Sequence, residues 1–224
     1  VSRTVMATLL AILTAIIIFG GLRRIVSVTT YLVPVMAIGY IILAIIVMVL
    51  NISDIPAVFA LIFKSAFGAE EMFAGMIGAA ITNGIKRGLF SNEAGMGSVP
   101  NAAATADVSH PVKQGLIQTL GVFIDTLIIC TATAMIVLTS DAYLSANATS
   151  INLTQASLTD SIGSWAGSIL AITIFFFAFS SILGNYYYGE SNIEFIKNSP
   201  IIINVFRVIV VGFVFFGSVA KVQL

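Results

Sequence analysis

The 224-residue sequence has few charged side chains, one cysteine and one histidine. Lysine, arginine, aspartate and glutamate make up 9% of it, whereas soluble domains carry roughly 25%. Ten basic residues balance ten acidic ones, so the formal net charge is zero and we expect no nucleic-acid partner. Cys130 lies in an apolar run, which excludes a disulfide framework and a cysteine metal cluster. An initiating methionine and a signal-peptide pattern are also missing, so we expect the chain to begin inside a longer protein.

Apolar residues dominate what is present, at 58% of the chain, and they fall into long runs. A membrane-spanning helix needs about 20 mostly apolar residues. The strands of an outer-membrane barrel would be about half that length and alternating in polarity, so the runs favour helices. The sequence predicts an all-α polytopic membrane protein, a single transmembrane domain over 1–224 with about six transmembrane helices. These lie at 5–21, 32–50, about 67–90, 115–139, 163–185 and about 201–220.

Basic residues in the short connections predict the orientation, because cytoplasmic loops of membrane proteins are enriched in lysine and arginine. With residue 1 outside, three basic residues remain outside: Arg3, Lys64 and Lys221. The other seven then lie inside: Arg23, Arg24, Lys86, Arg87, Lys113, Lys197 and Arg207. Arg207 stands within two turns of a predicted cytoplasmic end, where we interpret it as an anchor that extends its charge to the interface.

The third run is rich in glycine, which has two interpretations. Glycines can allow close contact between membrane helices. Alternatively, the helix is broken near the membrane midplane, around Phe73, Gly75 and Gly78, which would free backbone groups to bind a zwitterion and a cation.

Asp125 is the clearest ionisable residue inside a predicted span, and such residues are functional candidates because burying them in a membrane is costly. It has three possible roles: cation ligand, proton carrier, or a structural acid bonded to Thr126, Thr131 or a neighbouring helix.

Three residues in the fifth run share one helical face because they stand at i, i+3 and i+4: Phe177, Ser180 and Ser181. A backbone carbonyl and two hydroxyls would supply the neutral oxygens that a small alkali cation prefers. The serines could equally bond back to carbonyls of their own helix.

The stretch "GLFSNEAGMGSVPNAAATADVSHPVKQG", at 88–115, interrupts the apolar pattern. Pro100 stands where a dinucleotide motif needs its third glycine, and a Walker lysine is absent, so phosphate loops are excluded. His110 has no recognisable nucleophile motif beside it, so we do not expect an enzyme. We interpret the stretch as a cytoplasmic connector in which Asn92 and Glu93 are either gating or simply solvated.

Four segments resemble the sodium:alanine (alanine or glycine:cation) symporter family: "RGLFSNEAGMGS", "HPVKQG", "GVFIDTLIICT" and "FAFSSILGNYYYGE". The resemblance implies a secondary active transporter of the plasma membrane with two inverted five-helix repeats (5+5) and discontinuous first and sixth helices. It implies import of small neutral amino acids such as alanine or glycine, coupled to sodium by alternating access. A proton-coupled symporter and an inactive transporter fragment are the alternatives.

The resemblance also assigns residues, with this chain covering about helices four to nine. The segment 67–90 falls on the broken sixth helix, with Phe73, Gly75 and Gly78 near the substrate. The eighth helix would hold sodium through Phe177, Ser180 and Ser181, with Ser181 also facing the substrate. Asn185 stands where some members carry a bulky tryptophan. Sodium is the only metal ion implied, the lipid bilayer is the surrounding, and no obligate protein partner is expected. The family's first three helices and its carboxyl end are missing from this sequence.

Overall fold

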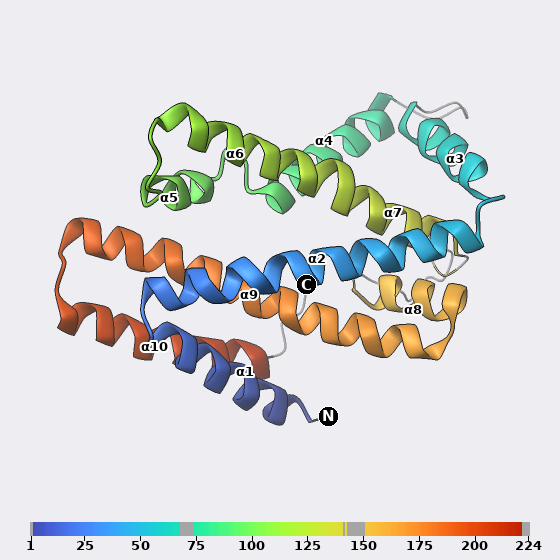
Figure 1. Cartoon of the computed structure of the whole chain (residues 1–224). Coiled ribbons are helices and arrows are strands. Elements are labelled where there is room, and N and C mark those ends of the chain that lie inside the picture. The colour runs from blue at the N-terminus through green and yellow to red at the C-terminus, as the bar shows by residue number, and fades with distance from the viewer. Residues whose placement is uncertain (1, 68–73, 141, 143–150, 221–224) are drawn as a thin grey trace. The chain divides into compact units, whose positions relative to one another are not determined.

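The computed structural model describes residues 2–67, 74–140, 142 and 151–220, which are helical apart from short connections (Figure 1). The chain divides into two compact units. The first comprises Val1–Met36 and Ile174–Leu224, and the second comprises Ala37–Thr173. Two long helices, α2 (Leu22–Leu50) and α9 (Ser164–Ile196), each contribute one part to either unit.

The first unit combines α1 (Arg3–Ile18), the start of α2, the end of α9 and α10 (Pro200–Val219). Its core consists of buried apolar side chains from α1, α2 and α9: Ile18, Ile25, Phe179, Leu183 and Tyr186. Gly21, with φ of 76°, provides the left-handed residue that the short α1–α2 connection requires. Pro200 begins α10 at a position where its missing N–H costs no helical hydrogen bond.

The second unit contains α3 (Ile55–Phe67), α4 (Ala74–Asn92), α5 (Ser98–Ala104), α6 (Pro111–Phe123) and α8 (Ile151–Ile162). A six-residue π-helix, η1 (Ile124–Ile129), follows α6 directly and leads into α7 (Cys130–Leu138). These three elements form one 28-residue rod from Pro111 to Leu138 (Figure 1). His110 caps α6, since its Nδ1 accepts a hydrogen bond from the Val112 N–H at 3.2 Å.

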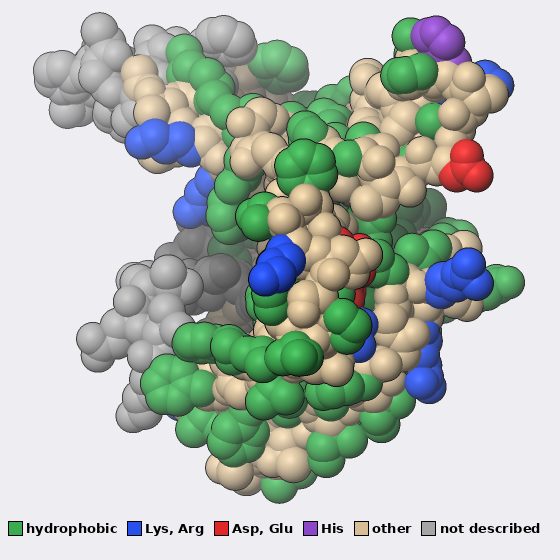
Figure 2. Space-filling model, turned by 90° about the vertical axis from the view of Figure 1, so that its left-hand side faces the viewer, with side chains coloured by type: hydrophobic (Ala, Val, Ile, Leu, Met, Phe, Trp, Pro, Cys, Tyr) green, Lys and Arg blue, Asp and Glu red, His purple; other side chains and the backbone are tan. Residues whose placement is uncertain are grey.

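Four helices of the described residues are long and apolar enough to cross a membrane: Leu22–Leu50, Pro111–Leu138, Ser164–Ile196 and Pro200–Val219. They confirm four of the predicted spans, but the prediction of six is not confirmed. α1 has 16 residues and is shorter than a span, and α4, which replaces the predicted run at 67–90, is not among the four. Apolar side chains gather on part of the face in Figure 2. Large apolar residues are also exposed along the described helices, for example Phe213 at 69%, which suits contact with lipid.

α2 also differs from the prediction because it begins ten residues earlier, which places Pro34 inside the helix instead of at its start. Proline removes one backbone hydrogen bond and usually interrupts a helix in water. Membrane helices tolerate it because threonine hydroxyls and neighbouring helices satisfy the backbone groups. Pro34 leaves the Thr30 carbonyl without its helical donor, and the Thr30 hydroxyl bonds one turn back, to the Val26 carbonyl at 2.7 Å.

Candidate functional site

α4 and α5 are two pieces of an interrupted helix, separated by five residues that include three left-handed conformations. Glu93, Gly95 and Gly97 have φ angles of 55°, 82° and 93°. Glycine adopts such angles freely, whereas Glu93 is the only residue other than a glycine that has positive φ in the described part of the chain. The Asn92 side chain supports the turn, because its Oδ1 accepts a hydrogen bond from the Ala94 N–H at 2.9 Å. The interruption is therefore defined by the local sequence.

The interruption lies beside the middle of the 28-residue rod. Ser91 Oγ donates to Asp125 Oδ2 at 2.7 Å, and Asn92 Nδ2 donates to Thr126 Oγ1 at 2.9 Å. Asp125 and Thr126 stand about halfway between Pro111 and Leu138. A point midway along a membrane-length helix lies near the centre of the bilayer. A rod that spans the bilayer places the last turn of α4 near its midplane. The cytoplasmic location of the connection at 88–115 stays a prediction.

The predicted break around Phe73, Gly75 and Gly78 falls only partly within the described residues. α4 is continuous from Ala74 through Gly75 and Gly78, so the described part of the predicted range holds a regular helix, while Phe73 lies outside the described residues. Glycine lowers helix propensity but does not by itself interrupt a helix. A break needs residues in non-helical conformations, and these occur at Glu93, Gly95 and Gly97.

The π-helix η1 brings Asp125 and Thr126 to face α4. A π-helical turn holds an extra residue, which displaces the following side chains relative to a regular α-helix, and such turns are frequent at functional sites. Asp125 is half-buried and its contacts come from α4. Ser91 Oγ also lies 3.4 Å from Cys130 Sγ, on the next turn of the rod. Of the interpretations left open for Asp125, the hydrogen bond to a neighbouring helix is present.

In the first unit, Ser180 Oγ donates to the Phe177 carbonyl at 2.9 Å. This is the back-bonded arrangement that the sequence left open. It keeps two of the candidate cation ligands together on one face of α9. Ser181 is exposed, and its carbonyl accepts a hydrogen bond from Asn185 Nδ2 at 2.9 Å.

Asn185 also lines a groove of about 670 Å³ between α1, α9 and α10, all within the first unit. The other lining residues are mostly apolar and include Leu10, Ile182, Val210 and Phe213. The asparagine amide is thus one of few polar groups on this surface.

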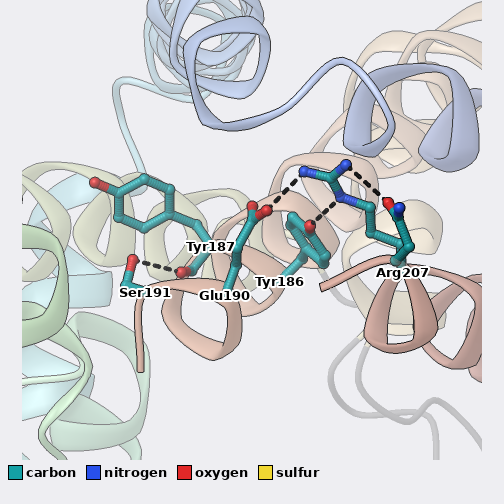
Figure 3. Close-up of polar contacts among 6 residues, drawn as sticks. Tyr186, Tyr187, Glu190, Ser191 and Arg207 are labelled. Carbon is teal, nitrogen blue, oxygen red and sulfur yellow. Dashed lines mark hydrogen bonds and ion pairs between the residues drawn. The ribbon is translucent and has the colours of Figure 1, made fainter. Parts of the chain in front are cut away.

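A polar cluster near the end of α9 was not predicted (Figure 3). Arg207 Nη2 lies 2.8 Å from Glu190 Oε1, and Arg207 Nε donates to the Tyr186 hydroxyl at 3.0 Å. Arg207 is therefore the partner of a buried carboxylate, which its interpretation as an anchor did not predict. The signal available in the sequence is a glutamate and an arginine in consecutive apolar helices, but it does not reveal which faces meet.

Chemistry based on clustered metal ligands has no support in the described residues, where no group of three or more histidine, cysteine, aspartate or glutamate side chains converges. The features available for binding are the interrupted α4–α5 backbone, the carboxylate of Asp125 and the oxygens of Phe177 and Ser180.

Comparison with known proteins gives one family. The model of the sodium:alanine symporter family matches residues 1–224. The chain is 54% identical over 224 residues to the amino-acid carrier protein AlsT of Bacillus subtilis, covering 100% of this chain and 48% of AlsT. It is 52% identical over 223 residues to a Bacillus subtilis protein named "Probable sodium/glutamine symporter GlnT", with 100% and 47% covered. The sodium/proton-dependent alanine carrier protein of Bacillus sp. (strain PS3) is 39% identical over 196 residues, with 81% and 44% covered. The chain thus spans about half the length of these relatives.

Proposed function

The chain belongs to the sodium:alanine symporter family, and on this basis we propose that the protein is a secondary active transporter that imports small neutral amino acids, such as alanine or glycine, together with sodium. The family consists of transporters rather than enzymes. Its relatives carry amino acids, which supports an amino-acid substrate and a membrane location. The plasma membrane is the compartment that uptake from outside requires.

The single observation that supports transport best is the interrupted helix α4–α5 beside the middle of a membrane-length rod. Irregular backbone at membrane depth is tolerated only where it lines a cavity or is buried in protein. In transporters, such interruptions present free backbone groups to the charged ends of a substrate. We place the amino acid at residues 93–97, with the last carbonyls of α4 available to its ammonium group. Asn92 and Glu93 then flank the substrate and change conformation as access alternates.

Sodium is assigned to the first unit, where the Phe177 carbonyl and Ser180 hydroxyl oxygens are 2.9 Å apart. Turning the Ser180 hydrogen away from the Phe177 carbonyl would direct both oxygens toward a cation. Ser181 and Asn185 stay candidates for substrate contact from α9. This chain has asparagine at position 185, where some family members carry a bulky tryptophan. The smaller side chain would leave more room for a substrate beside α9.

Uptake of labelled alanine into proteoliposomes containing the protein from its complete gene tests the proposal. An inward sodium gradient is expected to drive accumulation, and replacement of sodium by choline is expected to abolish it. Alanine accumulation that is unchanged by choline replacement and by loss of the sodium gradient would refute sodium symport.

Gly97→Ala tests the location of the substrate site. A side chain at a φ of 93° costs about 1–2 kcal/mol, so we expect uptake to fall about tenfold. Gly84→Ala is the matched control, because it lies within regular α4 and an added Cβ meets no atom within 4 Å. In Gly78→Ala the added Cβ also meets no atom within 4 Å. If Gly78→Ala lost uptake while Gly97→Ala transported normally, the substrate site would lie near Gly78, where the sequence predicted the break.

Ser180→Ala tests the sodium site. We expect the sodium concentration for half-maximal uptake to rise severalfold, because one neutral oxygen ligand is lost. Ser191→Ala is the matched control, since Ser191 Oγ makes the same kind of bond on the same helix, to the Tyr187 carbonyl at 2.8 Å. Equal sodium requirements in both variants would remove Ser180 from the ion site.

A further inference from the structure

The first half of the 28-residue rod is polar on the face that it presents to α4 and α5. Its half-buried positions between residues 111 and 126 are Gln114, Gln118, Val122, Asp125 and Thr126, and all other positions in this stretch are exposed. Their spacing of three to four residues places them on one face. Large apolar side chains such as Leu116 and Phe123 are exposed on the other faces. A membrane helix that is apolar toward lipid and polar toward protein is typical of a rod that lines a path for polar molecules.

Two residues of this face, Gln114 and Gln118, line a groove. α5 lies beside the first turns of α6 (Figure 1), and a groove of about 640 Å³ runs between the two helices, within the second unit. The lining includes Val99, in the first turn of α5 after the interruption, and Pro111, at the start of α6. Small-molecule sites measure about 300–1,000 Å³. The groove therefore has room for a small amino acid and extends from the proposed substrate site toward the α5–α6 connection.

The carboxamides of Gln114 and Gln118 lack partners. Neither forms a hydrogen bond with another residue in the part of the chain that the structure describes. Gln118 stands roughly 10 Å along the helix from the midpoint of the rod, and the hydrocarbon layer extends about 15 Å to either side of the bilayer centre. An unpaired amide at this depth is costly. Water or a bound molecule must therefore supply the missing partners.

The chemistry of the groove fits a zwitterion. A carboxamide offers an NH₂ donor and a carbonyl acceptor, so two of them one helical turn apart can donate to a carboxylate and accept from an ammonium group. None of the described residues that line the groove is charged, so a ligand with a net charge would lack compensation. A lipid acyl chain would leave both amides unpaired. A neutral amino acid satisfies both amides and brings no net charge.

We propose that the α5–α6 groove is a second amino-acid site, which the substrate occupies between the interruption and the α5–α6 connection. The substrate leaves residues 93–97, binds Gln118 inside the membrane and then passes Gln114 near its edge. With the predicted orientation, this path leads to the cytoplasm. The inference rests on the proposed transport function.

The test measures whether alanine protects a cysteine inside the groove from a small methanethiosulfonate reagent. The reporter is Ala103→Cys, which lines the groove from α5, in the complete protein with its other cysteines replaced by serine. Saturating alanine is expected to slow the modification at least tenfold. Gln118→Met keeps an unbranched side chain but removes the donor and the acceptor, so it should abolish the protection. Thr119→Val is the matched control, because Thr119 is exposed and does not line the groove, and it should keep the protection.

Uptake into proteoliposomes separates the groove from the interruption. Gln118→Met is expected to lower the maximal rate of alanine uptake about tenfold, as the loss of one hydrogen bond to a charged group implies. The external alanine concentration for half-maximal uptake should not rise, because the site at 93–97 is unchanged. Thr119→Val should transport at the rate of the wild type.

Two results would overturn the second site. Equal protection by alanine with and without Gln118→Met would show that a conformational change, and not occupancy of the groove, slows the modification. Absence of protection in a reporter protein that takes up alanine would show that the substrate does not occupy the groove. Absence of alanine uptake by the wild type would instead refute the proposed transport function itself.

Gln114→Met provides a second measurement in case Gln118→Met does not fold. It is expected to reduce the protection by alanine severalfold, because the remaining amide can hold only one end of the zwitterion. Full protection in a folded Gln114→Met variant would contradict the paired role of the two glutamines.

Discussion

Arg207 and Glu190 carry opposite charges in helices whose surroundings are almost entirely apolar. Glu190 is 1% exposed and Arg207 is 15% exposed at the side chain. Glu190 Oε2 is buried and has no hydrogen-bond partner, so Arg207 is the group that compensates the carboxylate. Breaking a buried pair costs more than the pair contributes, because the remaining charge is left uncompensated.

We therefore expect Arg207→Met to lower the free energy of unfolding by about 3 kcal/mol, measured by denaturant titration in detergent. The double variant Arg207→Met, Glu190→Gln should recover most of the loss, because it leaves no unpaired charge. A single variant as stable as the wild type would mean that Glu190 is compensated by another group.

The same pair illustrates what a sequence reveals of single residues. Asp125 was recognised because a lone acid in an apolar run is visible in the sequence itself. The Arg207–Glu190 contact depends on which faces of α9 and α10 meet. Helices that are apolar on all sides give no sequence pattern that defines these faces. Ser180 was placed on the same face as Phe177 by helical periodicity alone, and the 2.9 Å contact between their oxygens confirms that proximity. Whether they bind sodium stays a prediction.

At the scale of elements, close packing of α9 against α10 depends on Gly189. A Cβ added there would lie 2.5 Å from Cζ of Phe206, whose ring stacks on Tyr186 with centroids 5.5 Å apart. Gly184, on the same helix, has no atom within 4 Å of an added Cβ.

We expect Gly189→Ala to destabilise the protein by about 1–3 kcal/mol through overpacking, whereas Gly184→Ala should be neutral or slightly stabilising because alanine favours helix. Denaturant titration of both variants under the same conditions checks this difference. Equal stabilities would show that Phe206 repacks without cost.

Helices were predictable as apolar runs, but their ends and interruptions were less so. The fifth run was predicted to end at Asn185, yet α9 continues to Ile196. It continues because Arg207 compensates Glu190 and because Ser191 and Asn192 bond back to the carbonyls of Tyr187 and Tyr188. The π-helix left no trace in the pattern, since one extra residue in an apolar rod does not alter composition. Glycine density predicted a break around Phe73 to Gly78, of which Gly75 and Gly78 lie in regular helix, whereas positive φ angles mark an interruption at 93–97 that the sequence analysis did not predict.

At the scale of the whole molecule, the two compact units contain different candidate sites. The interruption and Asp125 belong to the second unit, and the oxygens of Phe177 and Ser180 belong to the first. α2 and α9 each contribute residues to both units. An alternating-access transporter needs elements that move as rigid bodies, and long continuous helices provide them.

The orientation in the membrane is the last prediction, because direction of transport depends on it. Seven basic residues fall on one side and three on the other, which predicts that the α5–α6 connection faces the cytoplasm and α8 faces outside. In a Cys130→Ser background, Asn152→Cys on α8 should react with a membrane-impermeant maleimide on intact cells. Ser109→Cys, in the exposed connection, should react only after permeabilisation. Phe213→Cys, on a lipid-facing surface of α10, is the control and should react under neither condition. Labelling of Ser109→Cys on intact cells would reverse the orientation, and inward movement of substrate through the proposed site would then have to be reassigned as export.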